Sequence, residues 1–367
     1  MAKRLATDRV LLWVAVILFG TGLLMLWSAS QPFSESGARV NGEAIMVRQL
    51  FFAILGVAVM LVSLRFDYRI LRSRYVAFAI LGLAMVLLLG ALASPSVNET
   101  NRWIRLWGGV SFQPSEFAKL AIVIFLASEF ERRARSLSTF RDLLAPAFSV
   151  GVVTLLVYLE PDFGSAIHIT LVASALAFLA GVPFRLFVMG GAILLPAMAV
   201  GIASASYRLE RILAFLAFLD PWGQRQGSGY QLIQSVIAVG SGGPLGRGFM
   251  RGEQKTSFLP YPYSDFIFGV VGEELGFIGA FVIVGLFLVF LWRGLRTAQR
   301  APDLFGRLLA AGLSMTIVSQ AFINMSVVLG LSPTKGIPLP FFSAGGTSLV
   351  LCLLSVGLVL NVSQHTD

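Results

Sequence analysis

Apolar residues occur in long blocks along the chain, and short polar stretches separate the blocks. Several blocks reach the ~20 residues that an α-helix needs to cross the hydrocarbon core of a bilayer. A helix on the surface of a soluble protein would show an apolar stripe and a polar face instead. The pattern predicts about ten spans, at residues 10–28, 46–64, 75–94, 115–130, 143–160, 165–181, 184–205, 266–292, 307–329 and 345–363.

Composition supports the same class. Of the 367 residues, 56% are hydrophobic and 13% are charged, whereas soluble domains carry about a quarter charged residues. So few charges cannot cover a water-facing surface. We therefore expect an all-α polytopic membrane protein, with one transmembrane domain over residues 1–367. The first block is longer than the core of a signal peptide and further spans follow it, which favours an uncleaved helix.

The net charge of +9 is explained by where the basic residues lie. They gather in the N-terminal segment and in the connections at 65–74, 132–141 and 293–307. An even number of predicted spans separates each of these segments from the next, so all of them lie on the same side of the membrane. The positive-inside rule places these segments in the cytoplasm, and an even number of spans then places both termini there. No long basic run and no aromatic–basic interleaving is present, so the charge does not indicate nucleic-acid binding.

One long connection lies between the seventh and eighth predicted spans, at residues 206–265 and on the outer side. It holds apolar residues at 211–216, which predict a short helix at the membrane interface, and a glycine-rich run at 240–248. Long loops with structure of their own are usually functional. A cap that only closes the helix bundle is the alternative.

Ionisable residues inside the spans are costly and indicate function by default. Glu116 and Lys119 are three residues apart, so they share a helix face and can pair. The pair either joins helices or lines a polar cavity. Asp162, in a tight turn between two spans, either caps the next helix or faces the same cavity. Glu273 and Glu274 lie two turns into the eighth span and must face the protein interior.

Asp265 is the last polar residue of the long connection and precedes Phe266 in the eighth span. Partial desolvation there would raise the pKa of its carboxyl and suit it for base catalysis; helix capping is the alternative. The last site, at residues 332–348, holds three prolines and three glycines. Broken backbone at membrane depth lines a cavity or is buried in protein. Lys335 could meet an anionic group in this segment, which also contains Ser343.

Ten short motifs are distributed along the chain from residue 101 to residue 348. They are NRWI at 101–104, QPSEFAK at 113–119, PDFG at 161–164, RIL at 211–213, DPW at 220–222, GYQLIQS at 229–235, GRG at 246–248, DFIF at 265–268, EELG at 273–276 and GGTS at 345–348. Together they resemble the SEDS family, the shape, elongation, division and sporulation proteins, over nearly the whole chain. Lys335 within TKG resembles the division branch more than the elongation branch. The Glu and His that often precede the family's catalytic carboxylate are absent from residues 260–264.

The resemblance implies a peptidoglycan glycosyltransferase in the bacterial cytoplasmic (inner) membrane that polymerises lipid II during cell division. It implies a class B penicillin-binding protein, an FtsI-like transpeptidase, as partner, together with other division proteins. Asp265 would be the general base on the acceptor sugar hydroxyl. The charge of the leaving pyrophosphate needs fixed cations, and the candidates are Arg102, Lys119, Arg211 and Lys335.

Glu116, Asp162 and Ser343 would line the cavity. A divalent cation such as Mg²⁺ or Mn²⁺ could share the work of the cationic side chains, although the sequence shows no dedicated metal cage. Two other functions use the same residues: a lipid II flippase, and the elongation-type polymerase of the same family. Inverted repeats would favour a transporter, and none is evident in the sequence. A scaffold that only recruits a synthase would leave the intramembrane charges unexplained.

Overall fold

The computed structural model describes residues 7–30, 42–94, 102–105, 111–134, 137, 140–203, 209–211, 213, 215, 228–334 and 336–366. Within these residues the regular secondary structure is helical apart from one antiparallel pair of two-residue strands, β1 (Ile104–Arg105) and β2 (Ser111–Phe112). The long helices are α1 (Arg9–Ala29), α2 (Gly42–Ser63), α3 (Arg74–Ala93), α4 (Pro114–Arg132), α5 (Phe140–Leu159), α6 (Phe163–Leu179), α7 (Phe184–Ala203), α11 (Ile267–Arg300), α12 (Leu304–Val328) and α13 (Gly346–Ser363).

These ten helices of the described part coincide with the ten predicted spans. Eight of them are long and apolar enough to cross a membrane. The exceptions are α6, which has 17 residues, and α4, which carries Glu116, Lys119 and Glu129. Most of α4 is buried among other helices, so its charges meet protein groups and not lipid. The prediction of an all-helical polytopic membrane protein is confirmed.

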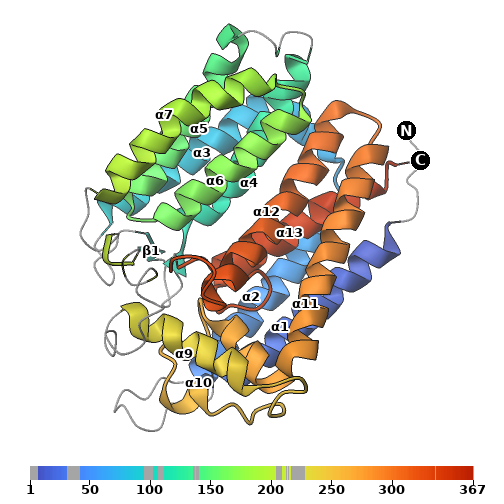
Figure 1. The fold of residues 1–367 in the computed structure, drawn as a ribbon. Coiled ribbons are helices and arrows are strands. Elements are labelled where there is room, and N and C mark those ends of the chain that lie inside the picture. The colour runs from blue at the N-terminus through green and yellow to red at the C-terminus, as the bar shows by residue number, and fades with distance from the viewer. Residues whose placement is uncertain are drawn as a thin grey trace.

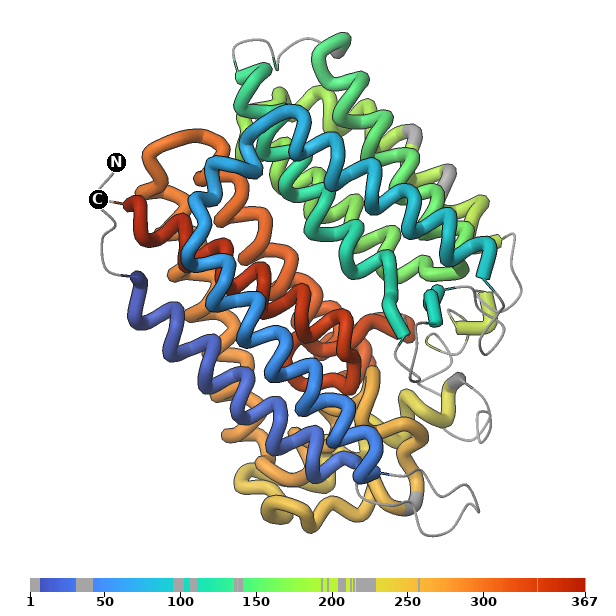
Figure 2. Tube along the Cα trace, turned by 180° about the vertical axis from the view of Figure 1, so that it is seen from behind, coloured from blue at the N-terminus to red at the C-terminus, as the bar shows by residue number. Residues whose placement is uncertain are grey.

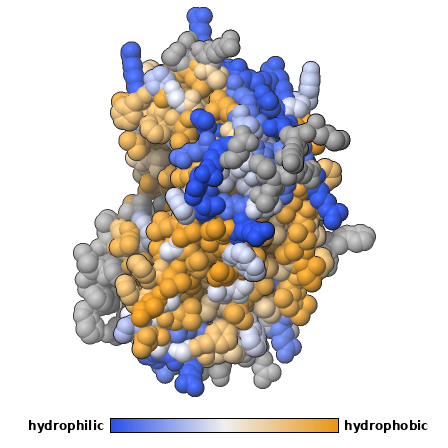
Figure 3. Space-filling model, turned by 90° about the vertical axis from the view of Figure 1, so that its right-hand side faces the viewer, coloured by the Kyte–Doolittle hydropathy of each residue, from blue (hydrophilic) through white to orange (hydrophobic). Residues whose placement is uncertain are grey.

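The bundle consists of two groups of helices. One group holds α3 to α7, and the other holds α1, α2, α11, α12 and α13 (Figures 1 and 2). Helix α12 packs against α4 and α6, and α13 packs against α4, so the two groups meet along these helices. Hydrophobic side chains cover much of the lateral face in Figure 3, with hydrophilic ones gathered toward its upper part and along its lower edge.

Both ends of the described chain lie at the same end of the bundle (Figure 1). The backbone N–H of Asp8 donates to Ser363 Oγ at 3.1 Å, and Arg293 pairs with Asp8 at 2.6 Å. Arg69 of the 3₁₀ helix η1 (Tyr68–Arg72) pairs with Asp303 at the same end. The arginine-rich connections therefore share one side, as an even number of crossings requires. That this side is the cytoplasm stays a prediction.

The opposite end of the bundle carries the described part of the long connection, with α9 (Ser228–Ser241) and α10 (Gln254–Ser257) (Figure 1). Helix α11 is interrupted there at Gly276, which has φ 68° and ψ −171°. The N–H groups of Phe277 and Ile278, next to the break, donate to the carbonyls of Gly243 and Pro244 at 2.8 and 3.1 Å. Backbone groups freed by a broken helix must find such partners at membrane depth.

The glycine-rich run at 240–248 contains glycine partly because the backbone of this loop lies directly against the backbone of α11. A Cβ on Gly246, which has φ 79°, would lie 2.2 Å from the carbonyl oxygen of Glu274. In the other direction, a Cβ on Gly276 would lie 2.2 Å from the nitrogen of Gly246. Only glycine fits both positions, so these residues serve the packing of the loop against α11.

Glu273 and Glu274 are fully buried at this break, as predicted. The Glu274 carboxylate binds the ammonium group of Lys255 and accepts from Ser28 Oγ at 2.7 Å and from the N–H of Met250 at 3.0 Å. Lys255 is itself 2% exposed. The two glutamates therefore attach residues 247–257 to the core of α11. Sequence reasoning did not single out Lys255.

Candidate active site

Asp265 lies immediately before α11, but it does not cap that helix. The N-cap residue is Phe266, and no side chain makes a capping hydrogen bond there. The Asp265 side chain instead lines a cavity of about 80 Å³. The other polar side chains in its wall are those of Arg211, Gln231, Asn324 and Thr334. Capping, the structural alternative for Asp265, is therefore not what holds its carboxyl.

Charged groups from three other segments act on Asp265. Burial raises the pKa of its carboxyl from 3.8 to about 6. Arg102 and Arg211 oppose that shift in pKa, and the negative charge of Asp162 adds to it. A carboxyl with a pKa close to the working pH can remove a proton from a hydroxyl and release it afterwards. Asp265, Asp162 and the two arginines thus form one electrostatic site, assembled from segments far apart in the sequence.

Arg102 is held against the turn between α5 and α6. Its Nε donates to the carbonyl of Glu160 at 3.3 Å, and a terminal nitrogen donates to the carbonyl of Pro161. The Glu160 side chain is fully buried, and neither carboxyl oxygen has a hydrogen-bond partner among the described residues. Burial, together with the charge of Asp162, raises the pKa of Glu160 to about 9. A protonated Glu160 leaves the positive charge of Arg102 available to an anion.

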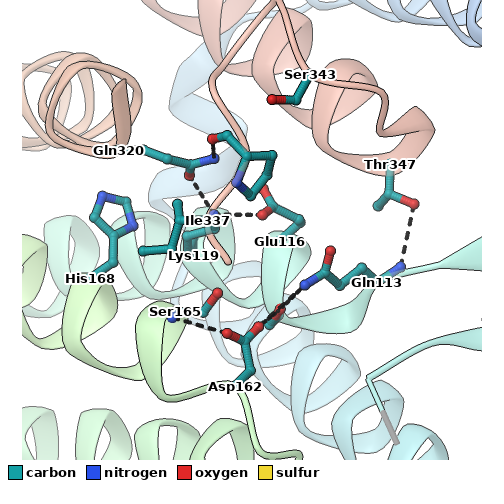
Figure 4. Close-up of polar contacts among 12 residues, drawn as sticks. Gln113, Glu116, Lys119, Asp162, Ser165, His168, Gln320, Ile337, Ser343 and Thr347 are labelled. Carbon is teal, nitrogen blue, oxygen red and sulfur yellow. Dashed lines mark hydrogen bonds and ion pairs between the residues drawn. The ribbon is translucent and has the colours of Figure 1, made fainter. Parts of the chain in front are cut away.

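Asp162 joins the starts of α4 and α6 (Figure 4). One carboxylate oxygen accepts from the backbone N–H of Ser165 at 3.2 Å and so caps α6, which is one of the two alternatives for this residue. The other accepts from Ser115 Oγ at 3.0 Å and from Gln113 Nε2 at 3.2 Å. Helix α4 begins at Pro114 with Gln113 at its N-cap, so Ser115 lies in the first turn of the helix.

Glu116 and Lys119 form the predicted pair at 2.8 Å, and their side chains are 6% and 4% exposed. Lys119 also donates to Gln320 Oε1 on α12 (Figure 4). The pair lines a cavity of about 30 Å³ between α4, α12 and α13. That cavity and the one beside Asp265 have no lining residue in common. The expectation of one shared cavity is therefore wrong for this conformation, and Arg102 and Arg211 are the cations that act on Asp265.

Ser343 supports the site from behind and lies outside both cavity walls. Its hydroxyl donates to the carbonyl of Ser264 at 2.7 Å and accepts from the N–H of Leu339 at 2.8 Å. These bonds fix the broken segment 336–345 against the residue that precedes Asp265. Lys335, the remaining predicted cation, lies outside the described residues.

Two amide side chains of α12 connect the two cavities, and sequence reasoning missed both. Gln320 donates to the carbonyl of Pro338 at 3.0 Å. Asn324, one turn further on, donates to the carbonyls of Ile337 and Asp265 at 2.8 and 2.7 Å. The available signal was the occurrence of two amides four residues apart in a membrane span, where polar groups need partners.

Among the described residues, no cluster of three or more His, Cys, Asp or Glu side chains could hold a metal ion. The divalent cation suggested by the resemblance stays a prediction. Arg102 and Arg211 are the cations that lower the pKa of the Asp265 carboxyl. In the described part of the site, one cavity is lined by a partly buried carboxyl, Arg211 and neutral amide and hydroxyl groups, and Arg102 acts electrostatically on the carboxyl.

Comparison with known proteins gives relatives that match this chain over nearly their full length. A family model described as cell cycle protein, named for FtsW, RodA and SpoVE, matches residues 9–367. The chain is 41% identical over 362 residues to the probable peptidoglycan glycosyltransferase FtsW of Geobacter metallireducens. This alignment covers 98% of this chain and 95% of the relative.

Two solved structures share the fold. A chain from a structure described as "Structural coordination of polymerization and crosslinking by a peptidoglycan synthase complex" superimposes with a TM-score of 0.78 and 30% identity, covering 98% of both chains. The rod shape determining protein RodA of Thermus thermophilus superimposes with a TM-score of 0.70 and 26% identity, covering 99% of both chains.

Proposed function

The chain belongs to the FtsW, RodA and SpoVE family of cell cycle proteins, and we propose that it polymerises lipid II with Asp265 as the general base. Like its relatives it is a peptidoglycan glycosyltransferase of the bacterial cytoplasmic membrane. One observation carries the assignment of the base. The Asp265 carboxyl makes no helix cap, lines the cavity and has a pKa raised to about 6.

The reaction needs a base on one side and cations on the other. The 4-hydroxyl oxygen of the acceptor sugar forms a bond to the anomeric carbon of the donor, and the bond from that carbon to the lipid pyrophosphate breaks. The hydroxyl proton passes to the carboxylate of Asp265, which suits a base whose pKa lies near the working pH. Negative charge grows on the pyrophosphate, and Arg102 and Arg211 act as its fixed partners.

We also propose that the protein serves the division septum together with a class B penicillin-binding protein. The identity of 41% to an FtsW supports the division branch, compared with 26% to a RodA. The related chain from a peptidoglycan synthase complex supports a synthase partner. A flippase for lipid II would use the same intramembrane charges, so the test must separate the two activities.

The test is gel analysis of glycan strands made from lipid II by the purified protein and its synthase partner. Asp265→Asn should bind the partner and lower polymerisation by about 10²–10⁴-fold, the usual contribution of a general base. Asp67→Asn is the matched control, because Asp67 caps η1 at the opposite end of the bundle and asparagine caps equally well. Adding a chelator to the same assay tests the divalent-cation prediction.

Polymerisation by Asp265→Asn at the wild-type rate would exclude the proposed base. A flippase gives a different pattern: Asp265→Asn would slow lipid II translocation in liposomes and leave polymerisation by a separate enzyme unchanged.

A further inference from the structure

An exposed tryptophan near the end of α11 lies beside two arginines. Trp292 is 57% exposed, and the guanidinium carbons of Arg293 and Arg296 lie 5.5 and 5.7 Å from the centre of its ring. The charge of Arg293 is balanced, because this side chain also pairs with Asp8 at 2.6 Å. Arg296 is partly buried, and it forms no ion pair with any residue that the structure describes. Its neighbour is therefore the face of an indole ring and not an anion.

A partly desolvated cation of a membrane protein usually pairs with an opposite charge. Arg300 lies one helical turn beyond Arg296, so the two share a face of α11. It is exposed and also has no ion pair within the described chain. Trp292, Arg296 and Arg300 thus form a row along α11 that leads from an apolar ring to two unpaired cations.

Helix α1 repeats this order at the same end of the bundle. Arg9 and Trp13 are four residues apart, so they share a face of α1, and both are exposed, Trp13 by 63%. The two helices pack against each other (Figure 1), and the pair of Asp8 with Arg293 joins their ends. Because α1 begins and α11 ends here, each tryptophan lies about one turn closer to the middle of the bundle than the nearest arginine on its face.

This arrangement matches the order of chemical groups in one leaflet of a membrane. Tryptophan favours the headgroup boundary, and arginine binds phosphate through several N–H donors. We infer that the joined ends of α1 and α11 bind the phosphate of an anionic phospholipid, with Arg296 as the main contact. Arg9 and Arg300 add positive charge around the phosphate, and Trp292 packs beside the glycerol and the first carbons of the acyl chains.

The surroundings favour a lipid over a soluble anion. On α11, Leu288 lies one turn before Trp292 and is 50% exposed. On α1, Ile17 lies one turn after Trp13 and is 45% exposed. Both faces therefore continue as apolar surface toward the middle of the bundle, where acyl chains fit. A zwitterionic headgroup would bring a cation of its own against the arginines, so a lipid with a net negative charge is favoured.

The test measures lipid binding by the full-length protein in detergent micelles, as the rise in its unfolding temperature when lipid is added. Phosphatidylglycerol should raise the unfolding temperature at a lower mole fraction than phosphatidylcholine with the same acyl chains. In Arg296→Gln, the amount of phosphatidylglycerol that gives half of this rise should increase about fivefold, the effect of losing one arginine beside membrane phosphates. When Arg296→Gln is combined with Arg300→Gln, the increase should be about 25-fold.

Arg74→Gln is the matched control. Arg74 is exposed, and its guanidinium carbon lies 5.4 Å from the centre of the Phe78 ring. The variant therefore removes an arginine beside an aromatic ring from the same end of the bundle, but on α3 in the other group of helices. It should leave the half-point for phosphatidylglycerol nearly unchanged. If Arg296→Gln does not fold, Arg300→Gln, at an exposed position, provides the second variant and should give about a fivefold change.

An equal response of the wild type to the two lipids would overturn the inference, and so would the absence of any response to phosphatidylglycerol, as expected if a protein partner covers these helix ends. Equal changes in Arg74→Gln and Arg296→Gln would also overturn it, because they would show only the general attraction of a basic surface to anionic lipid. The same rise in unfolding temperature with inorganic phosphate would exclude a lipid site, because the ligand would then be a soluble anion.

Discussion

Replacing Asp265 by asparagine should stabilise the folded protein above about pH 6 while it removes the proposed base. In the folded state burial raises the pKa of this carboxyl from 3.8 to about 6. That difference is 6 − 3.8, or about 2 pKa units, and each unit corresponds to 1.36 kcal/mol. The cost of keeping Asp265 ionised in the fold is therefore up to about 3 kcal/mol. Because the side chain is only partly buried, we expect about 1–3 kcal/mol.

The sign of the effect depends on pH. Below about pH 4 the carboxyl is protonated in the folded and unfolded states and contributes nothing. Between about pH 4 and 6 the unfolded chain gives up the proton first, so the wild type loses stability as pH rises. Above about pH 6 the full cost is present. An asparagine has no proton to lose, so the variant avoids this cost.

The assay is the apparent unfolding temperature of the purified protein in detergent, for the wild type and Asp265→Asn, at about pH 4 and about pH 8. The variant should unfold a few degrees higher than the wild type at the higher pH, and the two should agree at the lower pH. Asp67→Asn, at the other end of the bundle, should not raise the unfolding temperature at about pH 8, because asparagine caps η1 as well as aspartate does. A difference for Asp265→Asn that does not change with pH would refute the reasoning.

Two further predictions concern the break in α11. Lys255→Met should lower the free energy of unfolding by about 3 kcal/mol, because it leaves the Glu274 carboxylate buried with only neutral donors; thermal unfolding checks this, and an unchanged unfolding temperature would contradict it. Gly276→Ala should cost about 2 kcal/mol, since φ is positive and the new Cβ would overlap the backbone of the loop. Gly285→Ala in the same helix is the control and should be neutral or slightly stabilising, because nothing lies within 4 Å of its Cβ position.

The helices could be predicted from the sequence because lipid imposes a simple rule on them. Each span must be apolar over ~20 residues, so the ten blocks were visible without knowledge of any contact. The rule is weakest for α4, in which Glu116 and Lys119 are tolerated because the helix is buried in protein. The interior position of Glu273 and Glu274 followed from the same reasoning.

The site was only partly predictable, since side chains from distant segments build it. The spacing of Glu116 and Lys119 shows that they share a helix face, but it does not show which helix they meet, and the pair lies in a cavity separate from that of Asp265. The role of Asn324 depends on the carbonyls of Asp265 and Ile337, which reach α12 only in the folded chain. Lys255 stands in a polar stretch of the loop, where nothing in the sequence indicates burial against α11.

The central claim is that the ionised carboxylate of Asp265 takes the proton of the acceptor hydroxyl. The pH dependence of kcat/KM for lipid II polymerisation tests it most directly, because kcat/KM reports the ionisation of the free enzyme. The claim predicts that kcat/KM rises tenfold per pH unit at low pH and levels off above an apparent pKa of about 6. A rate that stays constant from about pH 5 to about pH 8 would contradict it.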